Sequence, residues 1–295
     1  MATSSLWTFH GKLLPGESFD SWLIRLAHGN AIDLRSFFQS LLPSNYVSLH
    51  STLELPLTLA LKNPQAIRHA ITMLVNHAPS SPDAVTKSMF RSTGQLDLLG
   101  WSRKRDALKA FLQRSTEHRT GKKFKCNYAT QFCPTCLQED TVPYLRKEWS
   151  LNFVTLCPVH MTLLYDRCTV CCQPLHSEAL DWRLNLYQCA VCSTDLRALP
   201  ELHVHGFSKP SSIQTQLLKE IEMLLNESSG GLPLYRIVLE RLEANYYDDI
   251  FLNRLKKAVT QEFGASHNLS SSFARASVQE RYVATRLLAE QTLFG

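Results

Sequence analysis

Apolar residues recur at helical spacing near the start of the chain. One face of a predicted helix is formed by Phe19, Trp22, Leu23 and Leu26. Ser18 stands directly before this helix as its cap, and Gly29-Asn30 is a typical helix end. A second helix is predicted over residues 34–42, because Asp33 can cap it and Pro43 stops it.

Two more helices are predicted where a capping residue precedes a proline. Asn63-Pro64 opens a helix over residues 65–77, and Ser81-Pro82 opens one over residues 83–90. Proline at the first helical position loses no hydrogen bond, because its missing N–H would have had no partner there. Several short helices with tight turns are compatible with a helix-turn-helix domain. A plain helical bundle accounts for the pattern equally well.

Helical periodicity returns after residue 209. Helices are predicted over residues 212–226, 234–244, 250–263 and 278–293. Pro233 begins the second of these, and Asp249 can cap the third, which ends at Gly264. The spacing fits a second helix-turn-helix or a dimerisation bundle, and the pattern does not choose between them.

The segment between these helical regions contains four pairs of metal-ligand residues, each with a two-residue spacer. The pairs are Cys133 and Cys136, Cys157 and His160, Cys168 and Cys171, and Cys189 and Cys192. Such a spacer lets both side chains reach one metal from a tight turn, and zinc prefers four nitrogen or sulfur ligands in a tetrahedron. Eight ligands fill two shells, so two structural Zn²⁺ ions are expected.

The order of the pairs bears on how they share the two ions. Sequential sites would join the first pair with the second and the third with the fourth, whereas a RING-like cross-brace would alternate them. Seven residues separate His160 from Cys168, which is room for a short strand and turn between two separate sites. We therefore expect sequential sites. Cys172 breaks the spacing that Cys171 keeps, and Cys126 lies outside the pattern.

Other uses of these cysteines fit less well. Disulfides need an oxidising compartment, and the first ten residues lack the apolar core of a signal peptide. Thioredoxin-like chemistry needs one Cys-x-x-Cys, not four pairs. A catalytic zinc keeps an open position for water, whereas this pattern fills every position, so the metals are expected to build a scaffold and no catalytic residue is predicted.

The stretches that connect the pairs are aromatic and β-prone. Apolar residues alternate over residues 182–188, which indicates a short strand leading into Cys189. We expect the aromatic residues of the segment to form a small core around the metals. They are Trp149, Phe153, Trp182 and Tyr187.

The charge of the chain is concentrated in one segment. The 295 residues carry a net charge of +5 with a pI of about 8.7, while residues 103–125 alone carry nine basic and two acidic residues, a net charge of +7. Such a run can neutralise phosphates, and a solvated linker is the equally weighted alternative. The predicted phosphate contacts are Arg103, Lys104, Arg105, Lys122 and Lys123.

These patterns together predict a mainly α fold with a small zinc-ribbon-type β module. The expected order is an N-terminal helix-turn-helix-like domain (1–100), a basic helix and linker (101–128), a tandem zinc-finger module (129–200) and a C-terminal helical domain (201–295). No apolar run reaches the length of about 18 residues that a membrane span needs, so no membrane association is expected. Nine cysteines without an export signal are typical of a reducing cytoplasm.

The collected motifs resemble the TniQ/TnsD family of transposition-targeting proteins. The match begins with Pro15-Gly-Glu-Ser18 followed by Trp22-Leu-Ile-Arg-Leu26, and continues through the first two ligand pairs and Pro143-Tyr144-Leu-Arg146 to Asp166-x-Cys168-x-x-Cys171. It covers residues 13–192. The combined order of the motifs is specific, although each motif alone is not.

The resemblance implies an adaptor without catalytic activity. Such proteins link a target-recognition device to an AAA+ transposition regulator, which recruits the transposase. The device is a Cascade-type CRISPR effector with its guide RNA, or an attachment-site DNA that the protein reads directly. Dimers occur among them, so a homodimer is a further expectation. The short chain favours the RNA-guided group, and the protein would join the nucleoid when engaged on DNA.

Two other classes of function compete with this one. A zinc-containing helix-turn-helix transcription regulator would use the N-terminal helices and the basic run, and would bind duplex DNA without a partner. An enzyme, either a RING-like ligase or a zinc hydrolase, ranks well behind. Closed ligand sets argue against the hydrolase and the spacing after His160 argues against the ligase.

Overall fold

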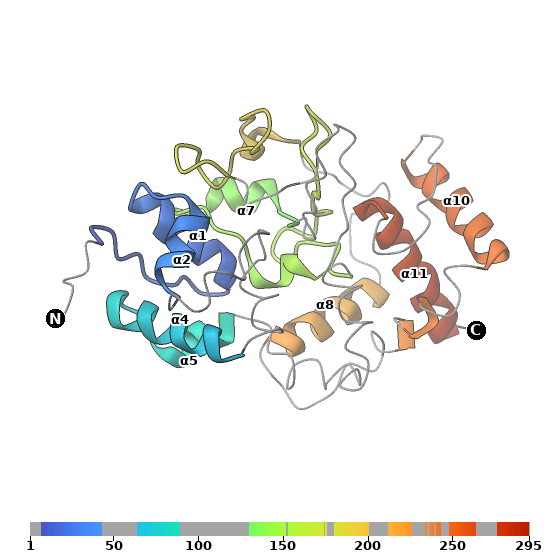
Figure 1. Cartoon of the computed structure of the whole chain (residues 1–295). Coiled ribbons are helices and arrows are strands. Elements are labelled where there is room, and N and C mark those ends of the chain that lie inside the picture. Colours follow the sequence, from blue (N-terminus) through green and yellow to red (C-terminus); the bar gives the residue numbers. More distant parts are fainter. Residues whose placement is uncertain are drawn as a thin grey trace.

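The computed structural model is mainly helical in the part of the chain that it describes (Figure 1). That part consists of residues 7–42, 64–88, 130–151, 153–173, 175, 180–200, 212–225, 234, 237–238, 240–242, 248–263 and 276–294. Its α-helices are α1 (Phe19–Gly29), α2 (Leu34–Ser40), α4 (Pro64–His77), α5 (Pro82–Ser88), α7 (Pro134–Glu139), α8 (Ser212–Leu225), α10 (Asp249–Phe263) and α11 (Val278–Phe294). Two short 3₁₀ helices, η3 (Lys147–Ser150) and η5 (Leu196–Ala198), lie in the cysteine-rich segment.

The predicted starts of the N-terminal helices are confirmed. The Ser18 side chain accepts a hydrogen bond from the Ser21 N–H, and the Asp33 side chain accepts one from the Ser36 N–H. These bonds satisfy donors that the first turn of a helix leaves without a partner. α4 and α5 begin at the predicted prolines and pack against each other.

The C-terminal helices also lie close to their predicted positions, with one correction. The prediction that Asp249 caps α10 is wrong by one residue: Asp249 is already helical, and the Asp248 side chain accepts from the Ile250 N–H (3.0 Å). α11 begins with a capping box that the periodicity did not reveal. The Ser277 hydroxyl accepts from the Glu280 N–H (3.2 Å), and the Glu280 carboxylate accepts from the Ser277 N–H (3.1 Å).

The cysteine-rich segment has less regular structure than predicted. The described residues that were expected to form short strands make isolated β-bridges instead: Phe132 with Tyr165, Leu156 with Leu163, and Gln188 with Asp195. Most of residues 182–188 form turns, and Trp182 is 43% exposed, so the prediction that it lies in the core is wrong. Trp149 and Phe153 are buried as predicted, and Tyr187 is partly buried. Alternating apolar residues need a neighbouring strand to pair with, and none lies beside 182–188 in the described chain.

The N-terminal helices dock on the cysteine-rich segment through its residues 144–147. The Ser18 N–H donates to the Leu145 carbonyl (2.9 Å), and the Lys147 N–H donates to the Gly16 carbonyl (2.9 Å). The Tyr144 hydroxyl donates to the Pro15 carbonyl (2.9 Å). Gly16 has a φ of 71°, a left-handed conformation that glycine adopts without strain, and it turns the chain into this contact.

A buried carboxylate next to α1 stabilises this contact between the N-terminal helices and residues 144–147. Glu17 is fully buried and accepts two hydrogen bonds from the Arg25 guanidinium, both of 2.7 Å. It also accepts from the Ser21 hydroxyl (2.9 Å), whose oxygen in turn accepts from the Leu145 N–H (2.9 Å). A buried charge of this kind is stable only when it is paired and hydrogen-bonded. The contact surface therefore depends on this set of residues as a unit.

The C-terminal helices dock on the same segment through Asp166. The Asp166 carboxylate accepts hydrogen bonds from the Val278 N–H (3.1 Å), at the start of α11, and from the Arg281 guanidinium (3.2 Å). Both charged side chains are buried, and Arg281 also donates to the Ala276 carbonyl (3.1 Å). Figure 1 shows the result: the cysteine-rich segment lies between the N-terminal helices and α11. The ion pair thus joins residues 115 positions apart in the sequence.

Among the described helices, we find no stretch with the length and apolar character required to span a bilayer.

We predict that Asp166→Ala strongly destabilises the protein. Removing one partner of a buried ion pair leaves the other charge uncompensated, which typically costs about 3–5 kcal/mol in the free energy of unfolding. Chemical denaturation of the metal-loaded protein measures this change. The control is Asp181→Ala, which removes the exposed partner of Arg183. Equal stability of the two variants would contradict the role assigned to Asp166.

Candidate metal centres

The first cluster brings together Cys133, Cys136, Cys157 and His160, with all four ligand atoms within 4.8 Å of one another. The Cys136 and Cys157 Sγ atoms are 3.5 Å apart, and the His160 Nδ1 atom lies 3.2 Å from Cys136 Sγ and 3.5 Å from Cys133 Sγ. Ligands at about 2.0–2.3 Å from a tetrahedral zinc ion are separated by about 3.3–3.8 Å, so the set fits that ion. The three cysteines are buried.

The second cluster brings together Cys168, Cys171, Cys189 and Cys192 with the same spread. The Sγ atoms of Cys168 and Cys192 are 3.6 Å apart, as are those of Cys171 and Cys189. This cluster lies nearer the surface, because Cys192 is exposed and Cys171 only partly buried. The structure thus brings the four pairs together in the sequential grouping, and each cluster could hold a metal ion.

Three of the four pairs lie in the same kind of turn. In each, the N–H of the first ligand donates across the turn to a carbonyl five residues later: Cys157 to Thr162 (2.8 Å), Cys168 to Gln173 (2.9 Å) and Cys189 to Thr194 (2.9 Å). The residue directly after the second ligand has a positive φ in each turn, 58° at Met161, 56° at Cys172 and 59° at Ser193. Cys172 therefore occupies a turn position and is exposed, which explains why it does not belong to the cluster.

The remaining pair is held by a helix instead of a turn. Cys133 precedes α7 and Cys136 lies in its first turn, where the backbone N–H groups and the helix dipole favour a thiolate. The Gln131 side-chain amide lies 2.9–3.1 Å from the carbonyl oxygens of Trp149, Leu151 and Val154. Gln131 thus fixes the loop that returns to Cys157, so that the two halves of the first cluster face each other.

Among the described residues, two side chains outside the ligand set lie within 3.1 Å of a ligand atom. The Glu139 carboxylate lies 2.9 Å from His160 Nε2, on the side of the ring away from the cysteines. Burial lowers the pKa of His160, but the bond to Glu139 and the neighbouring Cys133 raise it, and the net change is upward. A carboxylate at this nitrogen fixes the proton there and leaves Nδ1 free to bind a metal. The other is Thr194, whose hydroxyl oxygen lies 3.1 Å from Cys192 Sγ.

The pKa values of the thiols are shifted by their close neighbours. In the first cluster the hydrogen bond with Cys133 contributes most to raising the pKa of Cys157, to about 12. In the second, burial and the neighbouring sulfurs raise the pKa of Cys171 to about 12, while the Thr194 contacts lower that of Cys192 to about 6. Adjacent thiols cannot all ionise unless a positive ion compensates them, and a metal ion that binds them displaces their protons.

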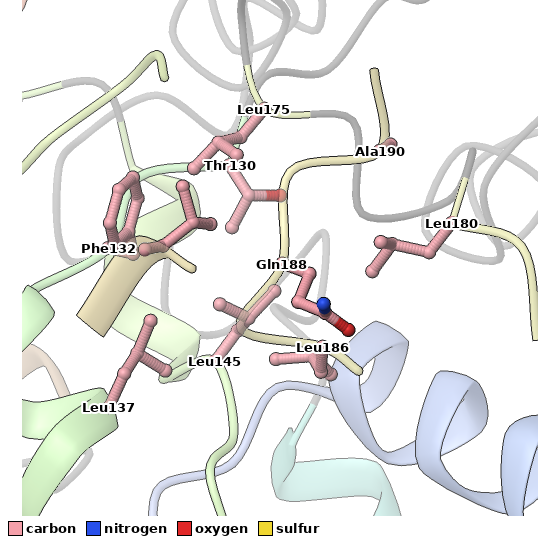
Figure 2. Close-up of a pocket in the computed structure, with 10 residues that line it drawn as sticks. Thr130, Phe132, Leu137, Leu145, Leu175, Leu180, Leu186, Gln188 and Ala190 are labelled. Carbon is pink, nitrogen blue, oxygen red and sulfur yellow. The ribbon is translucent and has the colours of Figure 1, made fainter. Parts of the chain in front are cut away.

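A small cavity lies in the core of the cysteine-rich segment. Its volume is about 10 Å³ and its lining is mostly leucine, with Gln188 and Thr130 as its polar members (Figure 2). Leu137 of α7 and Leu196 of η5 are among the lining residues, and these two helices pack against each other. A space of this size holds about one water molecule. The cavity is therefore a packing gap and no ligand site.

All eight residues that the sequence predicts as ligands lie in the two clusters. Sequence reasoning missed Glu139, Thr194 and Gln131, which contact or position them. For Glu139, the signal in the sequence was its position three residues after Cys136 in a short helix. The predicted phosphate contacts at Arg103, Lys104, Arg105, Lys122 and Lys123 lie outside the described residues.

The fold and the clusters define a helical protein that is assembled on a cysteine-rich scaffold with two candidate metal centres. Comparison with known families then identifies it: the model of the TniQ family matches residues 8–164, more than half of the chain, so the protein belongs to the TniQ family. It is accordingly a transposition-associated protein. The match covers the N-terminal helices and the first cluster and ends before Asp166. A search of curated proteins found no match.

We predict that Cys171→Ser removes one metal ion per chain and that Cys172→Ser removes none. The reason is that Cys172 occupies the left-handed position of its turn, while Cys171 points into the cluster. Elemental analysis of the purified variants gives the metal content directly. Loss of a metal ion in Cys172→Ser, with full content in Cys171→Ser, would show that the two thiols are assigned the wrong way round.

We also predict that Glu139→Ala weakens metal binding at the first cluster by about 10- to 100-fold, the usual effect of removing a carboxylate that supports a ligating histidine. Glu139 has a 64% exposed side chain, so its removal should leave the fold intact. Competition with a coloured chelator measures the affinity, in a Cys192→Ser background that retains only the first cluster. Glu222→Ala, at an exposed position of α8, is the control. Equal affinities for the two variants would rule out the support by Glu139.

Proposed function

We propose that the protein is a transposition target-selection adaptor. It links a target-recognition device, either a Cascade-type CRISPR effector with guide RNA or an attachment-site DNA, to an AAA+ regulator that recruits the transposase. The observation that carries this proposal is the TniQ match over residues 8–164, which takes in α1, α2, α4, α5, α7 and all four residues of the first cluster.

The chemistry of the clusters supports a scaffold role. We propose that both hold structural Zn²⁺, because Cys₃His and Cys₄ sets at these separations suit tetrahedral zinc. Four protein ligands leave no position for a reacting water, whereas catalytic zinc has only three protein ligands. The metals then act by holding the chain in shape, and the adaptor needs no turnover of its own.

The way the helices dock supports a rigid link between two partners. α1 is fixed to residues 144–147 through the buried Glu17, and α11 is fixed through the buried Asp166. Both joints use charged side chains that are paired inside the protein. A surface contacted on the N-terminal helices is therefore held at a set distance from one on the C-terminal helices, which is what an adaptor between two assemblies requires.

Target-directed integration tests the proposal. In a host that carries the transposition machinery, Cys133→Ser should abolish integration at the target site, because a broken ligand set removes the metal and with it part of the folding free energy. Cys172→Ser is the matched control, since it also removes a thiol but no ligand. Normal integration by a Cys133→Ser protein that has lost its metal would contradict the proposal.

Affinity purification from the host identifies the recognition device. Recovery of Cascade subunits and guide RNA, unchanged by nuclease treatment of the DNA, would support the RNA-guided form of the adaptor. Recovery of the AAA+ regulator with DNA alone would support direct reading of an attachment site. Recovery of neither, together with tight duplex binding by the isolated protein, would favour a transcription regulator and overturn the adaptor.

A further inference from the structure

α10 has one buried side and one exposed side along its whole length. Phe251, Leu255 and Val259 are buried, and the helix packs against α11. The opposite side, here called the outer face of α10, is formed by Ile250, Asn253, Arg254, Lys256, Lys257, Thr260 and Gln261, all of which are exposed. In Figure 1 α10 lies at the right-hand edge of the molecule, outside α11. The outer face is therefore open to a partner.

The outer face of α10 is positively charged. Arg254, Lys256 and Lys257 form no ion pair in the described part of the chain, although α10 does contain acidic residues. Glu262 lies on the other side of the helix, where it accepts from Arg286 of α11 (2.8 Å). Asp249 is the first helical residue, at the end where a carboxylate stabilises the helix. Three cations thus share a face with a single terminal acid.

This composition differs from that of an ordinary solvated helix face. Solvated faces usually alternate acids with bases, so that neighbouring turns form ion pairs. A protein-binding face would instead need an apolar centre, and the outer face has one large apolar residue, Ile250, which is 72% exposed. Unpaired cations together with amide and hydroxyl side chains fit a polyanion that also offers hydrogen-bonding edges.

The positions of these residues around the helix match the shape of a DNA groove. At about 100° per residue, Lys256 and Arg254 lie at opposite edges of an exposed arc of about 160°. Lys257, Gln261 and Ile250 lie between them. A helix of 15 residues is about 22 Å long and fits the major groove of B-DNA, which is about 12 Å wide.

We propose that the outer face of α10 binds double-stranded DNA in the major groove. Arg254 and Lys256 contact the phosphates on the two sides of the groove and set the affinity. Gln261 and Asn253 offer the amide groups that read adenine, Lys257 donates to guanine, and Ile250 contacts a thymine methyl group. This surface belongs to a different part of the sequence from the basic run at residues 103–125.

The affinity test uses the full chain with its metals bound and no partner protein. Fluorescence anisotropy with a duplex of about 30 base pairs, roughly three helical turns, gives the dissociation constant over a range of salt concentrations. Arg254→Gln/Lys256→Gln should weaken binding by about tenfold or more and reduce the slope of log K against log salt by about 2, because two phosphate contacts are lost. The control is Arg68→Gln/Lys219→Gln, which removes two exposed cations from α4 and α8.

Three outcomes of this experiment would overturn the proposal. The wild-type protein fails to bind the duplex at low salt; the α10 double variant keeps the affinity and salt slope of the wild type; or the control variant loses as much as the α10 variant. Preference for single-stranded RNA over the duplex, with the same loss in the α10 variant, would also overturn it, since the partner would then be a different one.

Base reading is tested separately by selection from a pool of random duplexes. The wild-type protein should enrich a short motif, and Gln261→Ala should relax the preference at one position while leaving the salt slope unchanged. Enrichment of the same motif by Gln261→Ala and Asn253→Ala would remove the base-reading part of the proposal.

The proposed DNA contact rests on the proposed function only in its role, which would be to hold the adaptor on target DNA. Because DNA binding is measured on the isolated protein and integration is measured in the host, either can fail alone. Normal integration with an α10 variant that binds DNA as well as the wild type would refute the DNA surface and leave the adaptor intact. If Cys133→Ser abolishes integration but the protein still binds DNA through α10, both proposals stand.

Discussion

The convergence of cysteine and histidine side chains into two groups is the constraint on which the rest of the structure depends. In its described residues the segment between the N-terminal and C-terminal helices has no strand ladder and only short helices, so backbone hydrogen bonds alone hold it weakly. Bringing four ligand atoms within 4.8 Å of one another is unfavourable for thiols that must ionise, unless a cation compensates them. A bound ion would therefore fix the positions of three turns and the start of α7.

The motifs that indicate the family take part in this arrangement more than their sequence positions suggest. Pro15, Gly16 and Glu17 form the joint with residues 144–147, and Arg146 continues it by donating to the Asp140 carboxylate at the end of α7 (2.9 and 3.0 Å). Asp166 stands two residues before Cys168 and holds α11. Residues that look like separate signatures are thus contacts between the scaffold and its helices. Their common role is to fix the positions of the helices relative to the clusters.

The sequence predicted those features that depend on neighbouring residues. Ser18 and Asp33 cap their helices because a cap and its first turn are adjacent in the chain, and the ligand pairs are visible because both members lie in one turn. Even the sequential grouping of the ligand pairs was predicted from the number of residues between His160 and Cys168 in the sequence. Features that join distant segments were not visible. No local pattern pairs Asp166 with Arg281 or brings Glu17 beside Leu145. The alternation at 182–188 indicated a strand, but the described part of the chain provides no partner strand for it.

The two clusters differ in their access to solvent, so metal ions bound to them would exchange on two timescales. The first is lined by three buried cysteines and a partly buried histidine, whereas the second presents Cys192 at the surface. A chelator or an oxidant would reach the second cluster through Cys192 without any opening of the fold, whereas it would reach the sulfur ligands of the first only when the surrounding core opens. Metal loss would then proceed in order from the C-terminal side. A partly demetallated chain would keep the joint between α1 and the first cluster, so that one end of the protein outlasts the other under stress.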